Sequence, residues 1–184
     1  MSKTTIRFGL SESEITEAIR EIEKFKQEFQ RKVDLYRKRI AEEIKNIASL
    51  NFDSSDMDDV VGIVVDKQLL HTGGTRKPDV KVRVEEKGQI SVVVADGKDA
   101  VWCEFGAGVH HNGSVGSSPN PYGNALGFTI GSYGEGRGKQ QVWGYENENG
   151  EIVITRGTPA SMPMYNAAQE VARKAIEIAR EVFG

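Results

Sequence analysis

The feature that most constrains the fold is the stretch of residues 11–50, which contains neither glycine nor proline. Ser11 and Glu14 have the spacing of a capping box, so we predict one long helix that begins there. Large apolar residues then recur at steps of three or four, which places them on one face of that helix; they are Ile15, Ile19, Ile22, Phe25, Phe29, Val33, Tyr36, Ile40, Ile44 and Ile47.

The length of this helix exceeds what one small domain can cover. At 1.5 Å per residue it would reach about 60 Å. We therefore expect part of the apolar stripe to pack on something other than the chain's own domain. The alternative is a kink or break near Asp34.

Length and charge limit the broad class. The 184 residues are enough for a single domain, 1–184, with its own core. The net charge of −3 does not attract the chain to nucleic acid or to a membrane. There is no apolar run of the roughly 20 residues that a membrane helix needs and no signal-peptide core, and the one cysteine excludes an intrachain disulfide. We expect a cytosolic location, or a particle assembled in a cytosol.

The middle of the chain, 60–155, has the pattern of a mainly antiparallel β-sheet. Alternating residues on both sides of Glu86-Lys87-Gly88 predict a hairpin, and Asn147-Glu148-Asn149-Gly150 predicts a second turn. The stretch 106–127 is rich in glycine, serine and asparagine and predicts a long loop inside the domain. The strands that we expect are 60–65, 80–84, 89–94, 100–105, 128–130, 141–145 and 151–154.

A second helix is expected at the end of the chain, over 162–183. Ser161 is a plausible cap, and Pro163 falls in the first turn, where its missing N–H does little harm. The overall prediction is an α+β fold with a long N-terminal helix, a mainly antiparallel sheet and a C-terminal helix packed on the sheet. The alanines of the last helix indicate a close approach to the sheet or to another helix; its apolar face holds Tyr165, Ala168, Ala172, Ala175, Ala179 and Val182.

Sites for chemistry are weakly supported. His71, His110, His111, Cys103 and Glu104 lack the spacing of a zinc site, and the acids of 53–59 lack the ligand order of a calcium loop. The glycine-rich segment 131–139 fails the spacing of a phosphate loop and indicates a hairpin tip instead. We therefore predict no enzyme, no metal and no cofactor. A small hydrolase that uses Glu104 with His110 or His111 as acid and base remains an alternative.

One basic cluster stands out on the first helix. A second alternative is that it contacts DNA phosphates, although acids nearby favour a mixed face or ion pairs between subunits. The cluster consists of Arg31, Lys32, Arg37, Lys38 and Arg39.

Two short segments carry a family resemblance. Val101-Trp102-Cys103-Glu104-Phe105-Gly106 resembles the aromatic-x-glutamate-phenylalanine-glycine segment of the lambdoid-type tail-completion, or head–tail joining, proteins in the neck of tailed bacteriophages. Pro159-Ala160-Ser161-Met162-Pro163-Met164-Tyr165-Asn166-Ala167 is similar to the proline-led entry to the last helix of that family. The order of the expected elements is also similar.

The resemblance implies a structural virion protein at the head–tail junction. It implies a homo-oligomeric ring, which we expect to have six subunits, between head-closure proteins and tail-terminator or tail-tube proteins. DNA in the channel is a possible further contact, and no membrane partner is expected. The residues that we expect at interfaces are Ile15, Ile22, Phe29, Tyr36, Glu104, Phe105, Gly106, His110, His111, Tyr133 and Arg137.

Overall fold

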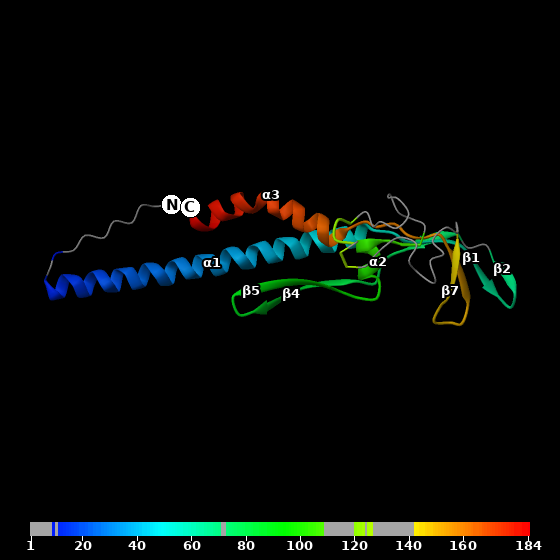
Figure 1. Cartoon of the computed structure of the whole chain (residues 1–184), viewed down its shortest axis with the longest axis horizontal. Coiled ribbons are helices and arrows are strands. Elements are labelled where there is room, and N and C mark those ends of the chain that lie inside the picture. The colour runs from blue at the N-terminus through cyan, green and yellow to red at the C-terminus, as the bar shows by residue number, and fades with distance from the viewer. Residues whose placement is uncertain (1–8, 10, 71–72, 109–119, 124, 127–141) are drawn as a thin grey trace.

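The computed structural model describes residues 9, 11–70, 73–108, 120–123, 125–126 and 142–184. The predicted α+β class is confirmed, because the chain combines a long N-terminal helix, antiparallel strands and a C-terminal helix (Figure 1). In chain order, the elements formed by the described residues are α1 Glu12–Ser54, β1 Met57–Val65, β2 Gln68–Leu70, β3 Gly74–Arg76, β4 Lys81–Lys87, β5 Ile90–Asp96, α2 Ala100–Phe105, β6 Ala107–Gly108, β7 Trp143–Glu146, β8 Ile152–Thr155, β9 Gly157–Thr158 and α3 Pro163–Phe183.

Helix α1 begins as its sequence predicts. The Ser11 hydroxyl accepts from the Glu14 N–H at 3.4 Å, and the Glu14 carboxylate accepts from the Ser11 N–H at 3.3 Å, which is a complete capping box. The helix passes Asp34 without interruption and ends at Ser54, four residues beyond the predicted end. The alternative of a break near Asp34 is therefore wrong.

The strands form small antiparallel sheets. In the largest, the order is β2-β1-β8-β7, and β3 also pairs with β1. The β4–β5 hairpin turns at Gly88, whose φ of 62° suits glycine, and β6 pairs with β9. The predicted hairpin, the strands at 60–65 and 151–154 and the turn at 147–150 are confirmed. The strand expected at 128–130 lies outside the described residues.

The prediction of a strand at 100–105 is wrong, because this segment is helix α2. Its buried residues are Ala100, Cys103 and Glu104, a spacing of three and four that belongs to a helix and not to an alternating strand. The Cys103 N–H donates to the Asp99 carbonyl at 3.0 Å and so forms a helical turn. Cys103 and Glu104 therefore do not lie on opposite faces, as the strand prediction required.

Helix α3 packs chiefly along α1. Its buried residues include Pro163, Ala167 and Val171, whereas Ala168 and Ala172 of the predicted apolar face are exposed. Ala48 of α1 is as completely buried as Ala167. The close helix–helix approach that alanine indicated is present, but it uses an adjacent line of residues.

Figure 1 shows how the elements lie along α1. Helix α3 runs beside the C-terminal part of α1, and the β4–β5 hairpin lies along another side of the same part. The N-terminal part of α1 extends beyond both. Within the described residues, no helix combines the length and the apolar character needed to cross a bilayer.

Candidate assembly site

The segments 101–106 and 159–167 meet in space. The Cys103 carbonyl, in α2, accepts from the N–H groups of Ser161 and Met162 at 2.9 and 3.1 Å. Gly106, which ends α2, has a φ of 80°, and a Cβ placed on it would lie 3.2 Å from the Cβ of Ala160. The positive φ therefore favours glycine at this position, and the tight contact with Ala160 adds to that preference.

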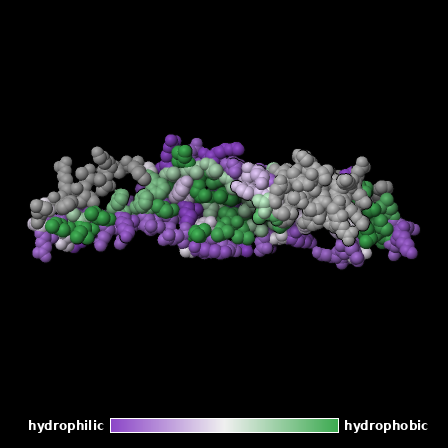
Figure 2. Space-filling model, in the orientation of Figure 1, coloured by the Kyte–Doolittle hydropathy of each residue, from purple (hydrophilic) through white to green (hydrophobic). Residues whose placement is uncertain are grey.

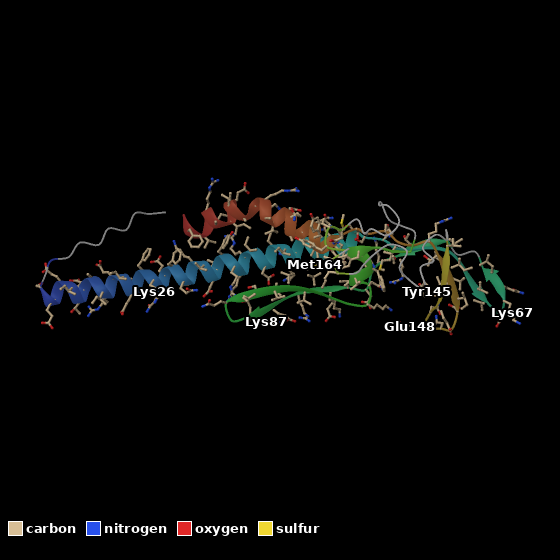
Figure 3. The ribbon with its side chains drawn as sticks, viewed as in Figure 1. Lys26, Lys67, Lys87, Tyr145, Glu148 and Met164 are labelled. Carbon is tan, nitrogen blue, oxygen red and sulfur yellow. The ribbon has the colours of Figure 1, made fainter. Side chains whose placement is uncertain are left out.

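Glu104 caps the start of α3 from a distance of about sixty residues in sequence. Its carboxylate accepts from the N–H groups of Met164 and Tyr165 at 2.9 and 3.0 Å, and from the side-chain amide of Asn120 at 2.8 Å. Figure 3 labels Met164 at this point, where α3 begins beside α1. These donors include helix N–H groups that the helix itself leaves unpaired.

The prediction that Ser161 caps the C-terminal helix is wrong. The residue before the helix is Met162, which has a φ of 54° and makes no side-chain capping bond. The Ser161 hydroxyl instead accepts from the hydroxyl of Ser55, at the end of α1, at 2.8 Å. Ser161 therefore links the two long helices, and Glu104 does the capping.

The environment of Glu104 is that of a structural carboxyl group. Burial raises its pKa above the ordinary value, and the hydrogen bonds from Met164, Tyr165 and Asn120 lower it by a smaller amount. The side chain is buried within its own chain, and its expected place at an interface stays a prediction. The neighbouring Phe105 and Gly106 are half-buried. The candidate partners of Glu104 in a hydrolase, His110 and His111, lie outside the described residues.

A second buried carboxylate, Asp99, was not identified from the sequence. Arg76 donates to both of its oxygens, at 2.6 and 2.8 Å, and the Asp79 N–H donates at 2.8 Å. Burial by itself would raise the pKa of Asp99, but the hydrogen bonds from Arg76 and Asp79 outweigh it and hold the pKa below the ordinary value. This cluster ties β3 to the start of α2.

The apolar stripe of α1 is covered along only part of its length. Phe183, near the end of α3, packs against Phe29 and Tyr36 with ring centroids 6.0 Å apart in each pair, and the Tyr36 hydroxyl donates to the Ala175 carbonyl. From its start up to this contact, the stripe is 40–53% exposed per residue, over Ile15, Ile19, Ile22, Phe25 and the edge of the contact at Phe29. Figure 2 shows this apolar surface on the projecting end of the molecule. The domain therefore leaves part of the stripe uncovered, and the expectation that this part packs on something else stays a prediction.

The basic cluster does not form one surface. Arg37 pairs with Glu86 of β4 at 2.9 Å, and Arg39 pairs with Glu181 of α3 at 2.6 Å. At about 100° per residue, Arg31 and Lys38 point away from the side that carries Arg37, and Lys32 and Arg39 lie on a third side. The ion pairs within the chain use two of the five cations that the DNA hypothesis needs.

The remaining candidate residues give no site in the described part of the chain. Tyr133, Arg137 and the segment 131–139 lie outside it. Asp56 pairs with Lys77 at 3.0 Å, and Asp53 is exposed. No group of three or more histidine, cysteine or acidic residues that could hold a metal ion occurs among the described residues.

Comparisons with protein-family models, with curated proteins and with solved structures found no match to this chain.

Proposed function

We propose that this chain is a ring-forming structural protein of a tailed bacteriophage, located in the neck at the head–tail junction. The observation that carries the proposal is the exposed stripe on the projecting part of α1, where five large apolar residues lie in one line. Such a contiguous apolar surface marks an interaction site in a protein. The proposed partners are further copies of the chain, together with head-closure and tail-terminator or tail-tube proteins.

Two further observations support a structural role. The segments that resemble the neck family pack directly against each other through Cys103, Ser161 and Met162, as a shared corner of a fold would require. The buried carboxylate of Glu104 accepts from N–H groups at the start of α3, and that of Asp99 accepts from the Arg76 guanidinium of β3. Each of these groups therefore holds two elements of the fold together, which is a structural use of a buried carboxylate.

The test is the mass of the purified protein by native mass spectrometry and light scattering. We expect six chains in the wild-type particle. Replacing Ile19 and Ile22 together with glutamate should give monomers of unchanged helical content, because both side chains are about half exposed and contribute little to the monomer's core. Leu35→Glu is the matched control, since Leu35 is 45% exposed on the opposite side of α1 and should leave the mass unchanged.

Location is tested separately by cryo-electron microscopy of purified virions, with antibody labelling of the chain. Density for a ring at the head–tail junction that fits the long helix is expected. A chain that remains monomeric at micromolar concentration, or one that is found only in the cytosol of infected cells, would contradict the proposal.

A further inference from the structure

Beside the exposed stripe, the fold contains an open groove of about 440 Å³ between α1, α3 and β5. Its walls are mainly apolar, with Arg37 and Ser91 as polar exceptions, and Figure 2 shows apolar surface in the middle of the molecule. The α3 wall is formed by three alanines and Val171, and the alanines leave room for large side chains from outside. Representative residues of the three walls are Val33 and Ile40, Ala168 and Ala172, and Val93.

We propose that this groove receives the projecting part of α1, residues 12–29, from a second copy of the chain. The inference rests on the proposed ring and names the contact that builds it. The dimensions agree: Val33 to Ile44 gives the groove a length of about 17 Å along α1, and Ile15 to Phe25 spans about 15 Å of helix. Isoleucine and phenylalanine side chains would fill the space that the alanines leave open.

The occupant must come from another chain. Helix α1 is continuous from Glu12 to Ser54, so its N-terminal part cannot fold back into the groove that its own C-terminal part helps to form. The stripe that packs under α3 is the same stripe that projects beyond it. A neighbour's groove therefore offers the projecting part the same kind of apolar helix contact that α3 offers the covered part.

Charge also favours this occupant. Arg37 is the one charged residue among the described residues that line the groove. Its guanidinium pairs with Glu86 at 2.9 Å, but its buried Nε has no hydrogen-bond partner among the described residues. A buried donor of this kind calls for a partner. The projecting segment 12–29 is acidic, with six glutamates against three basic residues. At about 100° per residue its glutamates flank both sides of the stripe, as Glu12 and Glu23 on one side and Glu14 and Glu21 on the other.

The contact would be heterologous, since a helix on one copy meets a groove on the next. Contacts of this type form closed rings when the rotation between subunits closes. Direct pairing of two projecting helices would instead be isologous and would stop at a dimer. The two arrangements can therefore be separated by asking which residues approach each other between chains.

The test is disulfide cross-linking between co-expressed single-cysteine variants. Position 19 lies near the middle of the exposed stripe and position 172 near the middle of the groove, so a link between Ile19→Cys and Ala172→Cys does not depend on the direction in which the helix enters. The native Cys103 is fully buried and should not react. On oxidation we expect a linked heterodimer when both variants are present and none from either variant alone. Ile19→Cys with Leu35→Cys is the control pair and should not link.

Each outcome decides the question. Linking of Ile19→Cys to itself would show pairing of projecting helices and overturn the groove contact. An intact ring without the Ile19–Ala172 link would also overturn it, while leaving the proposed ring in place; a wild-type chain that never assembles would overturn both. As an independent check, Ala172→Trp should fill the groove and weaken assembly at least tenfold, whereas Glu177→Trp, on another side of α3, should not.

Discussion

Replacing Glu104 with alanine should destabilise the fold strongly, because one side chain supports the start of α3. The change removes the acceptor for the N–H groups of Met164 and Tyr165 and for the amide of Asn120, at 2.8–3.0 Å. A hydrogen bond to a charged group is worth about 1.5–3 kcal/mol, and an unpaired buried donor costs about 1–3 kcal/mol.

The net cost is smaller than the sum of these values. Burial already works against the ionised carboxylate, as the raised pKa of Glu104 shows, and water can reach part of the site because Tyr165 is half-buried. We therefore expect a loss of about 3 kcal/mol, which for a chain of this size lowers Tm by about 6–12 °C. Glu104→Gln keeps one acceptor oxygen and should lose about half as much.

The assay is urea and thermal unfolding followed by circular dichroism. It should be done in the Ile19→Glu, Ile22→Glu background, because assembly would otherwise add a concentration-dependent stabilisation. The control is Glu148→Ala, since the Glu148 side chain is 88% exposed and its loss should change the unfolding free energy by less than about 0.5 kcal/mol. If Glu104→Ala were as mild as this control, the carboxylate would not be what holds the start of α3.

Three other changes test the same junction. Because the pKa of Glu104 is raised in the folded state, its contribution to stability is full at low pH and decreases as the pH rises from the ordinary carboxyl range through the raised value. In urea titrations, the difference in unfolding free energy between wild type and Glu104→Gln should therefore narrow over that range. A constant difference would contradict the burial argument. Gly106→Ala should cost about 2 kcal/mol in the same unfolding assay, because its φ of 80° is strained for alanine and the new Cβ meets Ala160. Asp99→Asn should lower the unfolding free energy by about 2 kcal/mol, because it weakens the hydrogen bonds from Arg76. Since the pKa of Asp99 is lowered in the folded state, wild type should be more stable than this variant at neutral pH, and the difference should disappear as the pH falls through the folded-state pKa.

The parts of the fold that could be predicted depend on local patterns. The capping box at Ser11 and Glu14 and the unbroken apolar period fixed the start and type of α1, and alternation around Gly88 did the same for the β4–β5 hairpin. The uncovered stripe could also be inferred, because a helix of this length cannot be buried by one small domain. These features need only neighbouring residues, or a length, to be recognised.

Helix α2 could not be predicted in this way. Its six residues include valine, tryptophan and phenylalanine, which favour strands, and the segment is too short for a helical period to be distinguished from alternation. What favours a helix here is a set of contacts with distant residues, including the bonds from Ser161 and Met162 to the Cys103 carbonyl. Tertiary structure therefore overrides the local preference in this segment.

The sequence contains one signal for the capping role of Glu104, and that signal lies in the segment 159–167. A proline at the first helical position places the N-cap at the residue before it. Here that residue is Met162, whose side chain has no oxygen to accept from the first N–H groups of α3. A buried helix start without a local acceptor requires one from elsewhere. The carboxylate that meets this need is Glu104, in the segment 101–106. The segments 101–106 and 159–167 therefore form one structural unit joined through a helix cap.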